Sequence, residues 1–179
     1  IDNLLFKNKL NDSNIDIAVG GDLFNQIGIT SKALENYNIS FLGTYSACAT
    51  FVENLIISAN MLSNKNIKNI IAITSSHNLT AEKQFRYPIE YGAMKYKCNT
   101  FTATGSVACL VSNKESSINI ESATIGQVIN MGIKDVNKYF KDFQQKLFDK
   151  TGLYCSIGIA TTKFLAKMGS DYKKPNGIT

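Results

Sequence analysis

Cys48 has the sequence surroundings of a nucleophilic cysteine. It lies in a run of small residues, 44–50, between a short apolar strand expected at 39–42 and a helix expected from residue 51. A helix N-terminus stabilises a thiolate, and small neighbours leave the sulfur approachable. A free cysteine is more commonly a small core residue. Both readings of Cys48 therefore stay open.

The segment 74–92 is dense in polar and aromatic residues and contains the only histidine, His77, and the only arginine, Arg86. A guanidinium pairs bidentately with carboxylates, and an imidazole donates to an anion or acts as a base. The alternative is a capping loop in which Arg86 pairs with Glu82 or Glu90. The segment predicts either an anion-binding site or such a loop.

The cysteine pattern argues against a metal site. The chain has four cysteines and one histidine, without a CxxC pair, so no zinc site can be assembled. We expect no metal, no cofactor and reduced thiols in a cytoplasmic compartment. No apolar run reaches the length of a membrane span, and no signal peptide is visible. Because the chain begins without Met, we expect a fragment or a processed start.

Charge divides the chain into two parts. Residues 1–133 carry ten basic and ten acidic side chains, whereas residues 134–179 carry nine lysines and four aspartates. The net charge of +5 therefore lies entirely in the second part. Such a segment suits phosphate or nucleic acid, although a solubilising lysine surface would have the same composition.

Hydrophobic patterning predicts an α/β fold. Strands are expected at 15–19, 39–42, 67–74, 100–104 and 107–112, with a loop at Gly20-Gly21-Asp22 and a β-rich stretch at 118–129. Helices are expected at 30–38 and, buried around most of its circumference, at 51–62. Residues 75–98 form a long connection. In the basic part we expect a helix at 138–150 ended by Gly152, a strand at 153–159, and a helix capped by Thr161 or Thr162 and stopped at 173–177.

Residues 1–137 closely resemble the stage V sporulation protein AD family. The resemblance is carried by these motifs: Gly21-Asp22-Leu23-Phe24-Asn25-Gln26, Ser46-Ala47-Cys48-Ala49-Thr50, Ser76-His77-Asn78 and Gln84-Phe85-Arg86-Tyr87-Pro88. It implies most of the N-terminal half of a thiolase-like fold, binding of dipicolinic acid and its uptake into the forespore. The implied partners are other stage V sporulation proteins at the forespore membrane.

The resemblance also implies residue roles. Dipicolinate is a flat aromatic dianion, which Arg86 would pair with and Phe85 or Tyr87 would stack on. The implied ligand-binding set is His77, Asn78, Glu82, Phe85, Arg86, Tyr87 and Glu90. Cys48 falls at the thiolase nucleophile position. Because the half of the fold that supplies the other catalytic groups is not in this sequence, acyl transfer by Cys48 is only a distant third reading.

Residues 141–179 resemble a different family, the Y-family DNA polymerases of the DNA polymerase IV type. The match runs through Thr151-Gly152-Leu153-Tyr154-Cys155-Ser156-Ile157-Gly158-Ile159-Ala160 and ends at Lys173-Lys174-Pro175-Asn176-Gly177. It implies a palm fragment in which Lys174 contacts the triphosphate of a nucleotide. The adjacent carboxylates that polymerisation needs are not in this sequence, so we expect weak DNA or nucleotide binding by residues 138–179 without polymerisation.

Together, the two resemblances predict a truncated chimera with segments 1–137 and 138–179. A partial sheet leaves an edge and an apolar face exposed, which favours a homodimer unless the second segment covers that face. We expect a cytoplasmic protein, peripheral at the forespore inner membrane.

Overall fold

A computed structural model of the chain describes residues 1–24, 27–85, 102–128, 132 and 134–179; the side chains of residues 82–85, 163 and 164 lie outside that description. The described residues divide into two compact units, Ile1–Ile125 and Gly126–Thr179, which are treated separately below. The boundary predicted at residue 137 stays a prediction.

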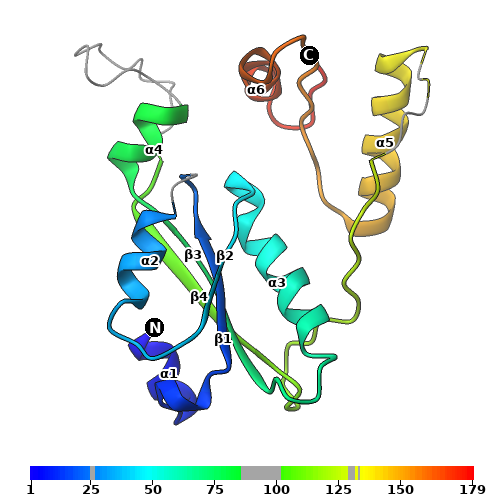
Figure 1. Ribbon diagram of the computed structural model, residues 1–179. Coiled ribbons are helices and arrows are strands. Elements are labelled where there is room, and N and C mark those ends of the chain that lie inside the picture. The colour runs from blue at the N-terminus through cyan, green and yellow to red at the C-terminus, as the bar shows by residue number, and fades with distance from the viewer. Residues whose placement is uncertain (25–26, 86–101, 129–131, 133) are drawn as a thin grey trace. The chain divides into compact units, whose positions relative to one another are not determined.

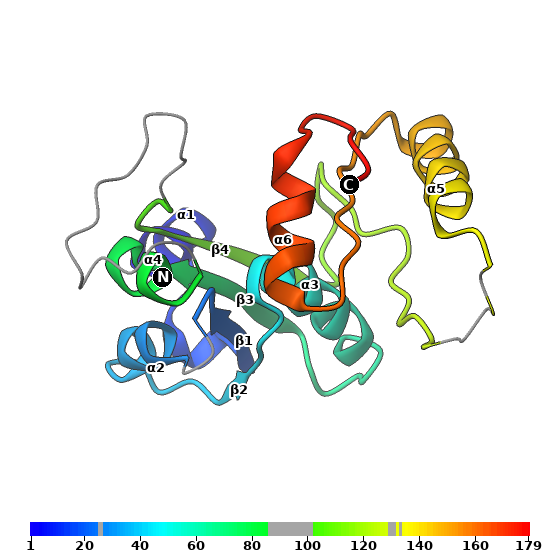
Figure 2. The ribbon, with the colours of Figure 1, turned by 90° about the horizontal axis from the view of Figure 1, so that it is seen from above.

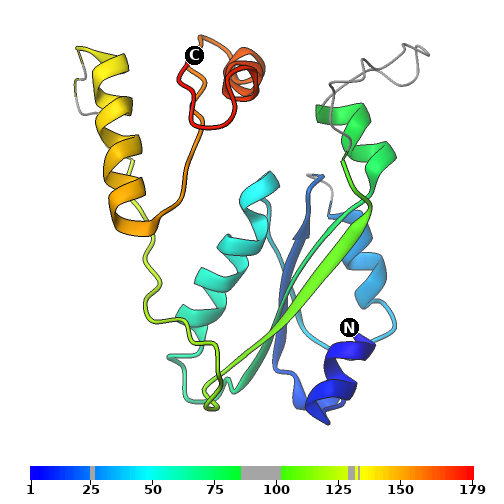
Figure 3. The ribbon, with the colours of Figure 1, turned by 180° about the vertical axis from the view of Figure 1, so that it is seen from behind.

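A four-stranded mixed sheet forms the centre of the first unit, with the order β2-β1-β3-β4 (Figure 1). The strands are β1 (Ile17–Asp22), β2 (Phe41–Gly43), β3 (Asn69–Ser76) and β4 (Gly105–Ser112). The first three are parallel, and β4 pairs antiparallel with β3 along their whole length, from Asn69 opposite Ser112 to Ser76 opposite Gly105 (Figure 3). The predicted α/β class is confirmed.

Helices cover both faces of this sheet (Figure 2). Helices α1 (Asp2–Asn8) and α2 (Gly28–Leu34) pack on one face and α3 (Thr50–Met61) on the other. The unit also contains α4 (Asn78–Phe85) and the 3-10 turns η1 (Asp12–Asn14) and η2 (Ala47–Ala49). Because successive strand residues point to opposite faces, Ala18, Ile71 and Ile73 pack with α1 and α2, whereas Val19 and Ile70 pack with residues of α3.

The second unit contains α5 (Val136–Thr151) and α6 (Lys163–Tyr172). As predicted, Gly152 ends α5 in a left-handed conformation at φ 69°, and the Thr162 side chain caps α6 by accepting from the Leu165 amide. The strand predicted at 153–159 is reduced to a single bridge between Ile157 and Ile178. No helix among the described residues is both long and apolar enough to cross a membrane.

Several predicted elements were wrong. Gly20-Gly21-Asp22 belongs to β1 rather than to a loop, and the long connection contains α4. Residues 102–104 and 118–128 form neither helix nor strand. Helix α3 is not buried throughout: its fully buried side chains are the polar Thr50, Asn54 and Ser58, whereas Val52 is 58% exposed.

Candidate functional site

The carboxyl ends of the three parallel strands meet at one edge of the sheet. Asp22 ends β1, the residues leading to Cys48 follow β2, and His77 follows β3 (Figure 1). In open α/β sheets this edge is where ligands bind. The structure therefore brings Cys48 and His77, predicted from separate motifs, to the same edge of the first unit.

Cys48 lies exposed in η2, directly before α3. The Thr50 hydroxyl shapes this turn by accepting from the Ser46 amide at 3.0 Å and donating to the Ala47 carbonyl at 2.8 Å. Ala47 has φ 49°, a left-handed conformation that is unusual for alanine. The residue is exposed, which does not match a core position, and the role of Cys48 stays a prediction.

His77 and Asn78 form the start of α4. His77 is exposed, and its carbonyl oxygen accepts from the Ala81 amide at 3.0 Å and the Thr80 hydroxyl at 2.9 Å. The Asn78 amide donates to the Thr104 hydroxyl at 2.9 Å. This hydrogen bond holds the beginning of α4 beside the residues that lead into β4.

The remaining predicted ligand-binding residues are not placed. The side chains of Glu82 and Phe85, and the whole of Arg86, Tyr87 and Glu90, lie outside the described residues. The structure thus gives the position of Cys48, His77 and Asn78 and leaves the other five as predictions.

Asp22 is a residue that the sequence analysis missed. Its side chain is only 1% exposed, and its carboxylate accepts from the Ile29 amide at 2.7 Å, the Thr30 amide at 2.9 Å and the Ser75 hydroxyl at 2.7 Å. The Thr30 hydroxyl donates to it as well. Asp22 thereby satisfies the free amides of the first turn of α2 and joins β1 to β3. The sequence signal that could have identified Asp22 is an aspartate at the end of a strand, a few residues before a helix whose first amides it can accept from.

A second buried polar network positions α3. The Thr44 hydroxyl donates to Oδ1 of the Asn54 side chain, and Nδ2 of the same side chain donates to the Ile73 backbone carbonyl at 2.8 Å. A side chain on Gly21 would place its Cβ 2.0 Å from the Thr44 carbonyl oxygen. The glycine is therefore required for the close approach of β1 to the chain that leads to Cys48.

In the second unit, Lys174 is engaged within the chain. Its ammonium lies 2.6 Å from the Asp171 carboxylate, and Lys167 contacts the same carboxylate at 3.3 Å. The hydrogen bond from Lys174, with help from Lys167, holds the pKa of Asp171 below its ordinary value. A phosphate at Lys174 would have to displace Asp171.

A metal centre is not apparent in the part of the chain that the structure describes. No three histidine, cysteine, aspartate or glutamate side chains gather there in a way that could hold an ion.

Comparison with known proteins gives two kinds of match. The family model of stage V sporulation protein AD matches residues 1–142. Stage V sporulation protein AD of Bacillus subtilis is 41% identical over 182 aligned positions, which cover 91% of this chain and 54% of that protein. The chain therefore spans about half the length of that relative.

Shorter matches point to a polymerase. DNA polymerase IV of Lactococcus lactis subsp. cremoris is 40% identical over 67 residues, 34% of this chain and 18% of that protein. DNA polymerase IV of Streptococcus pyogenes is 45% identical over 49 residues, 27% of this chain and 14% of that protein. Among solved structures, 3-oxoacyl-[acyl-carrier-protein] synthase III from Aquifex aeolicus VF5 covers 63% of this chain and 35% of its own at a TM-score of 0.45 and 15% identity.

Proposed function

The chain belongs to the stage V sporulation protein AD family, and from this premise we propose that it serves sporulation by binding dipicolinic acid for uptake into the forespore. The observation that carries the proposal is the family match over residues 1–142, because it contains the whole sheet edge with Cys48 and His77 and the whole segment 74–92. The binding step is non-catalytic in this proposal.

The chemistry of the edge supports an anionic ligand. Helix α3 begins two residues after Cys48, and a helix N-terminus attracts negative charge. His77 adds an exposed imidazole at the same edge. In the proposed complex Arg86 pairs with one carboxylate of dipicolinate, and Phe85 or Tyr87 stacks on its ring.

The proposal also covers the location of the protein in the cell and its partners. The chain would act on the cytoplasmic side, peripheral at the forespore inner membrane, together with other stage V sporulation proteins. A homodimer would cover the apolar surface that α3 leaves exposed, of which Val52 is part. The stage V sporulation partners are inferred from family membership, and the homodimer from this exposed surface.

Thermal unfolding tests the binding step. Dipicolinate should raise the melting temperature of the full chain, and at a concentration 100-fold above Kd the added stability should be about 2.7 kcal/mol. Benzoate, which has the ring but one carboxylate, should give a smaller shift. Equal shifts with the two acids, or none with dipicolinate, would refute the proposal.

A second candidate function rests on the polymerase matches. In it, residues 138–179 bind DNA or a nucleotide weakly, with Lys174 on a phosphate. Because Asp171 holds Lys174, Asp171→Asn should strengthen salt-dependent binding to a DNA oligonucleotide, and Lys174→Ala should weaken it. Lys150→Ala, which removes the same charge elsewhere, is the matched control. If Lys174→Ala and Lys150→Ala weaken binding equally, Lys174 has no special role.

A further inference from the structure

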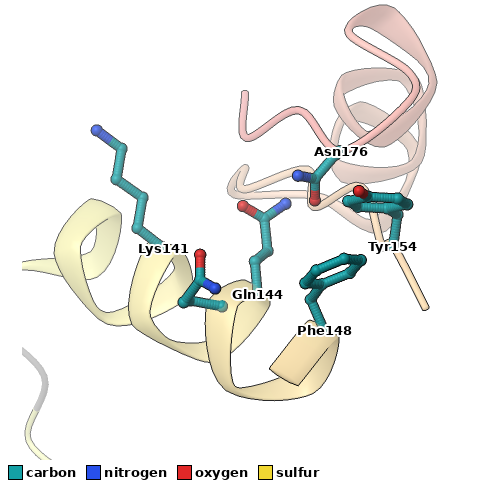
Figure 4. A pocket seen from close by; sticks show the side chains of 6 residues that line it. Lys141, Gln144, Phe148, Tyr154 and Asn176 are labelled. Atoms are coloured by element: carbon teal, nitrogen blue, oxygen red, sulfur yellow. The ribbon is translucent and has the colours of Figure 1, made fainter. Parts of the chain in front are cut away.

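A pocket of about 380 Å³ lies within the second unit, between α5 and the chain segments that contain Tyr154 and Asn176 (Figure 4). One wall is a stripe of α5, formed by Lys141, Gln144, Gln145 and Phe148. These positions are three, four and seven residues apart, so they share one helix face. Tyr154 and Asn176 complete the lining. The volume falls in the range of small-molecule sites.

An aromatic pair forms one end of the pocket. The Phe148 and Tyr154 rings are stacked, with centroids 4.5 Å apart and planes at 23°. Tyr154 is 63% exposed whereas Phe148 is 37% exposed, so Tyr154 presents more open ring surface. Aromatic side chains that are held in this way accept a nucleic-acid base by stacking.

Amide groups lie beside the aromatic pair. The Gln144 and Asn176 side chains line the same pocket as the Tyr154 ring, and Asn176 is drawn nearer to the ring (Figure 4). The Gln144 amide nitrogen donates to the Cys155 carbonyl at 2.7 Å, which fixes the side chain and leaves its oxygen available. Amides both donate and accept, as the edge of a base requires.

A cation lies at the other end of the α5 stripe. Lys141 precedes Phe148 by seven residues, about 10 Å along the helix axis, which is the scale that separates the base of a nucleotide from its phosphates. Lys141 is exposed and forms no ion pair with any residue that the structure describes. The surrounding residues 126–179 carry nine lysines against four aspartates, so their field favours an anion.

We propose that this pocket binds a nucleotide, with the base on Tyr154 and the phosphates at Lys141. A simple anion would not need the aromatic pair, and an apolar ligand would not need three amides and a lysine. The site shares only its ligand class with the second candidate function, because Lys174 does not line the pocket. It is independent of dipicolinate binding, which is proposed for the first unit.

Equilibrium dialysis of the full chain with ADP tests the proposal. Pyrophosphate and adenosine, each lacking one half of the ligand, should bind at least about tenfold more weakly than ADP. Tyr154→Ala should weaken ADP binding about tenfold, Tyr154→Phe should preserve it because the stacking ring remains, and Lys141→Ala should weaken ADP but not adenosine. Tyr172→Ala, at an exposed tyrosine on α6, is the matched control. A single-stranded oligonucleotide measured in parallel shows whether a free nucleotide or one within a strand is preferred.

Three results would overturn the proposal. These are no saturable ADP binding, equal binding of pyrophosphate and ADP, and ADP binding that Tyr154→Ala leaves unchanged. Loss in Lys174→Ala combined with full binding in Tyr154→Ala would move the nucleotide to Lys174, which retains the second candidate function and rejects this pocket. Circular dichroism of each variant establishes that the fold is intact.

Discussion

Asp22 connects three elements of the first unit through one buried carboxylate. It accepts from two amides of α2, from Thr30 and from Ser75 of β3 at the edge where Cys48 and His77 lie. A buried carboxylate of this kind is stable only while its partners remain, because an unpaired buried polar group costs free energy. Asp22 is therefore a structural residue of the candidate site rather than a ligand-binding one.

Replacing Asp22 tests this role. Asp22→Ala removes the hydrogen bonds and leaves the Thr30 and Ser75 hydroxyls without their shared acceptor, so the free energy of unfolding should fall by about 3 kcal/mol or more. Urea denaturation measures it. Asp142→Ala, at an exposed aspartate of α5, should change stability by less than about 0.5 kcal/mol. Comparable losses in the two variants would show that the Asp22 network contributes little.

Asp16 makes stability depend on pH. Hydrogen bonds from the Asn69 and Lys68 amides lower the pKa of Asp16 from its ordinary value of 3.8. A carboxyl whose pKa is lower in the folded state stabilises the protein fully above its unfolded pKa and loses that contribution as the pH falls through the folded value. Asp16→Ala should therefore be less stable than the parent at pH 7, and the gap should narrow below about pH 4.

The matched control for Asp16 is Glu121→Ala, which removes an exposed carboxylate of the same unit. Because only Asp16 accepts the hydrogen bonds from the Lys68 and Asn69 amides, Asp16→Ala should lose more stability at pH 7 than Glu121→Ala. Urea midpoints between pH 2 and pH 7 provide the comparison. A gap for Asp16→Ala that stays constant over this range would contradict the stated role of its ionised form.

At the scale of elements, glycine allows β1 to lie close to the chain before α3. Gly21→Ala would place its Cβ 2.0 Å from a backbone oxygen of Thr44, so backbone must move. The melting temperature should fall by an amount that corresponds to about 2 kcal/mol or more. Gly28→Ala is the matched control because nothing lies within 4 Å of its added Cβ and alanine favours the helix. Equal stability of both variants would show that β1 can shift freely.

Local signals predicted some elements well. Helix α5 follows from its apolar spacing and Gly152, α6 from the Thr162 cap, and β3 from its continuous apolar run. In each case a short stretch of sequence contains both the pattern and its stop signal. The positions of Cys48 before a helix and of His77 after a strand could be read in the same way.

Other elements depend on contacts that the sequence does not display. Residues 118–128 are rich in β-branched types but pair with no strand among the described residues, since β-propensity reflects context. Gly20 and Gly21 read as a loop, yet β2 and β3 flank them and hold them in β1. Asn54 is buried on α3 where it accepts a hydrogen bond from Thr44, a contact that hydrophobic periodicity cannot reveal.

At the scale of the whole molecule, two units carry separate proposals. The first unit, residues 1–125, contains the sheet edge, and the second, residues 126–179, contains the pocket beside α5. Family membership extends over residues 1–142, while the chain spans about half the length of its Bacillus subtilis relative. A measurement of dipicolinate binding therefore tests whether this half of the family's sequence is sufficient to bind the ligand.

Isothermal titration of the full chain with dipicolinate near pH 7 is the most direct test. The account predicts saturable binding with one site per chain, weakened at least about tenfold in Arg86→Ala, because a charge-assisted hydrogen-bonded pair contributes roughly 1.5–3 kcal/mol. Lys7→Ala, which removes a positive charge on α1, should bind like the parent. Heat that never saturates, or equal binding by the parent and Arg86→Ala, would contradict the proposed dipicolinate site.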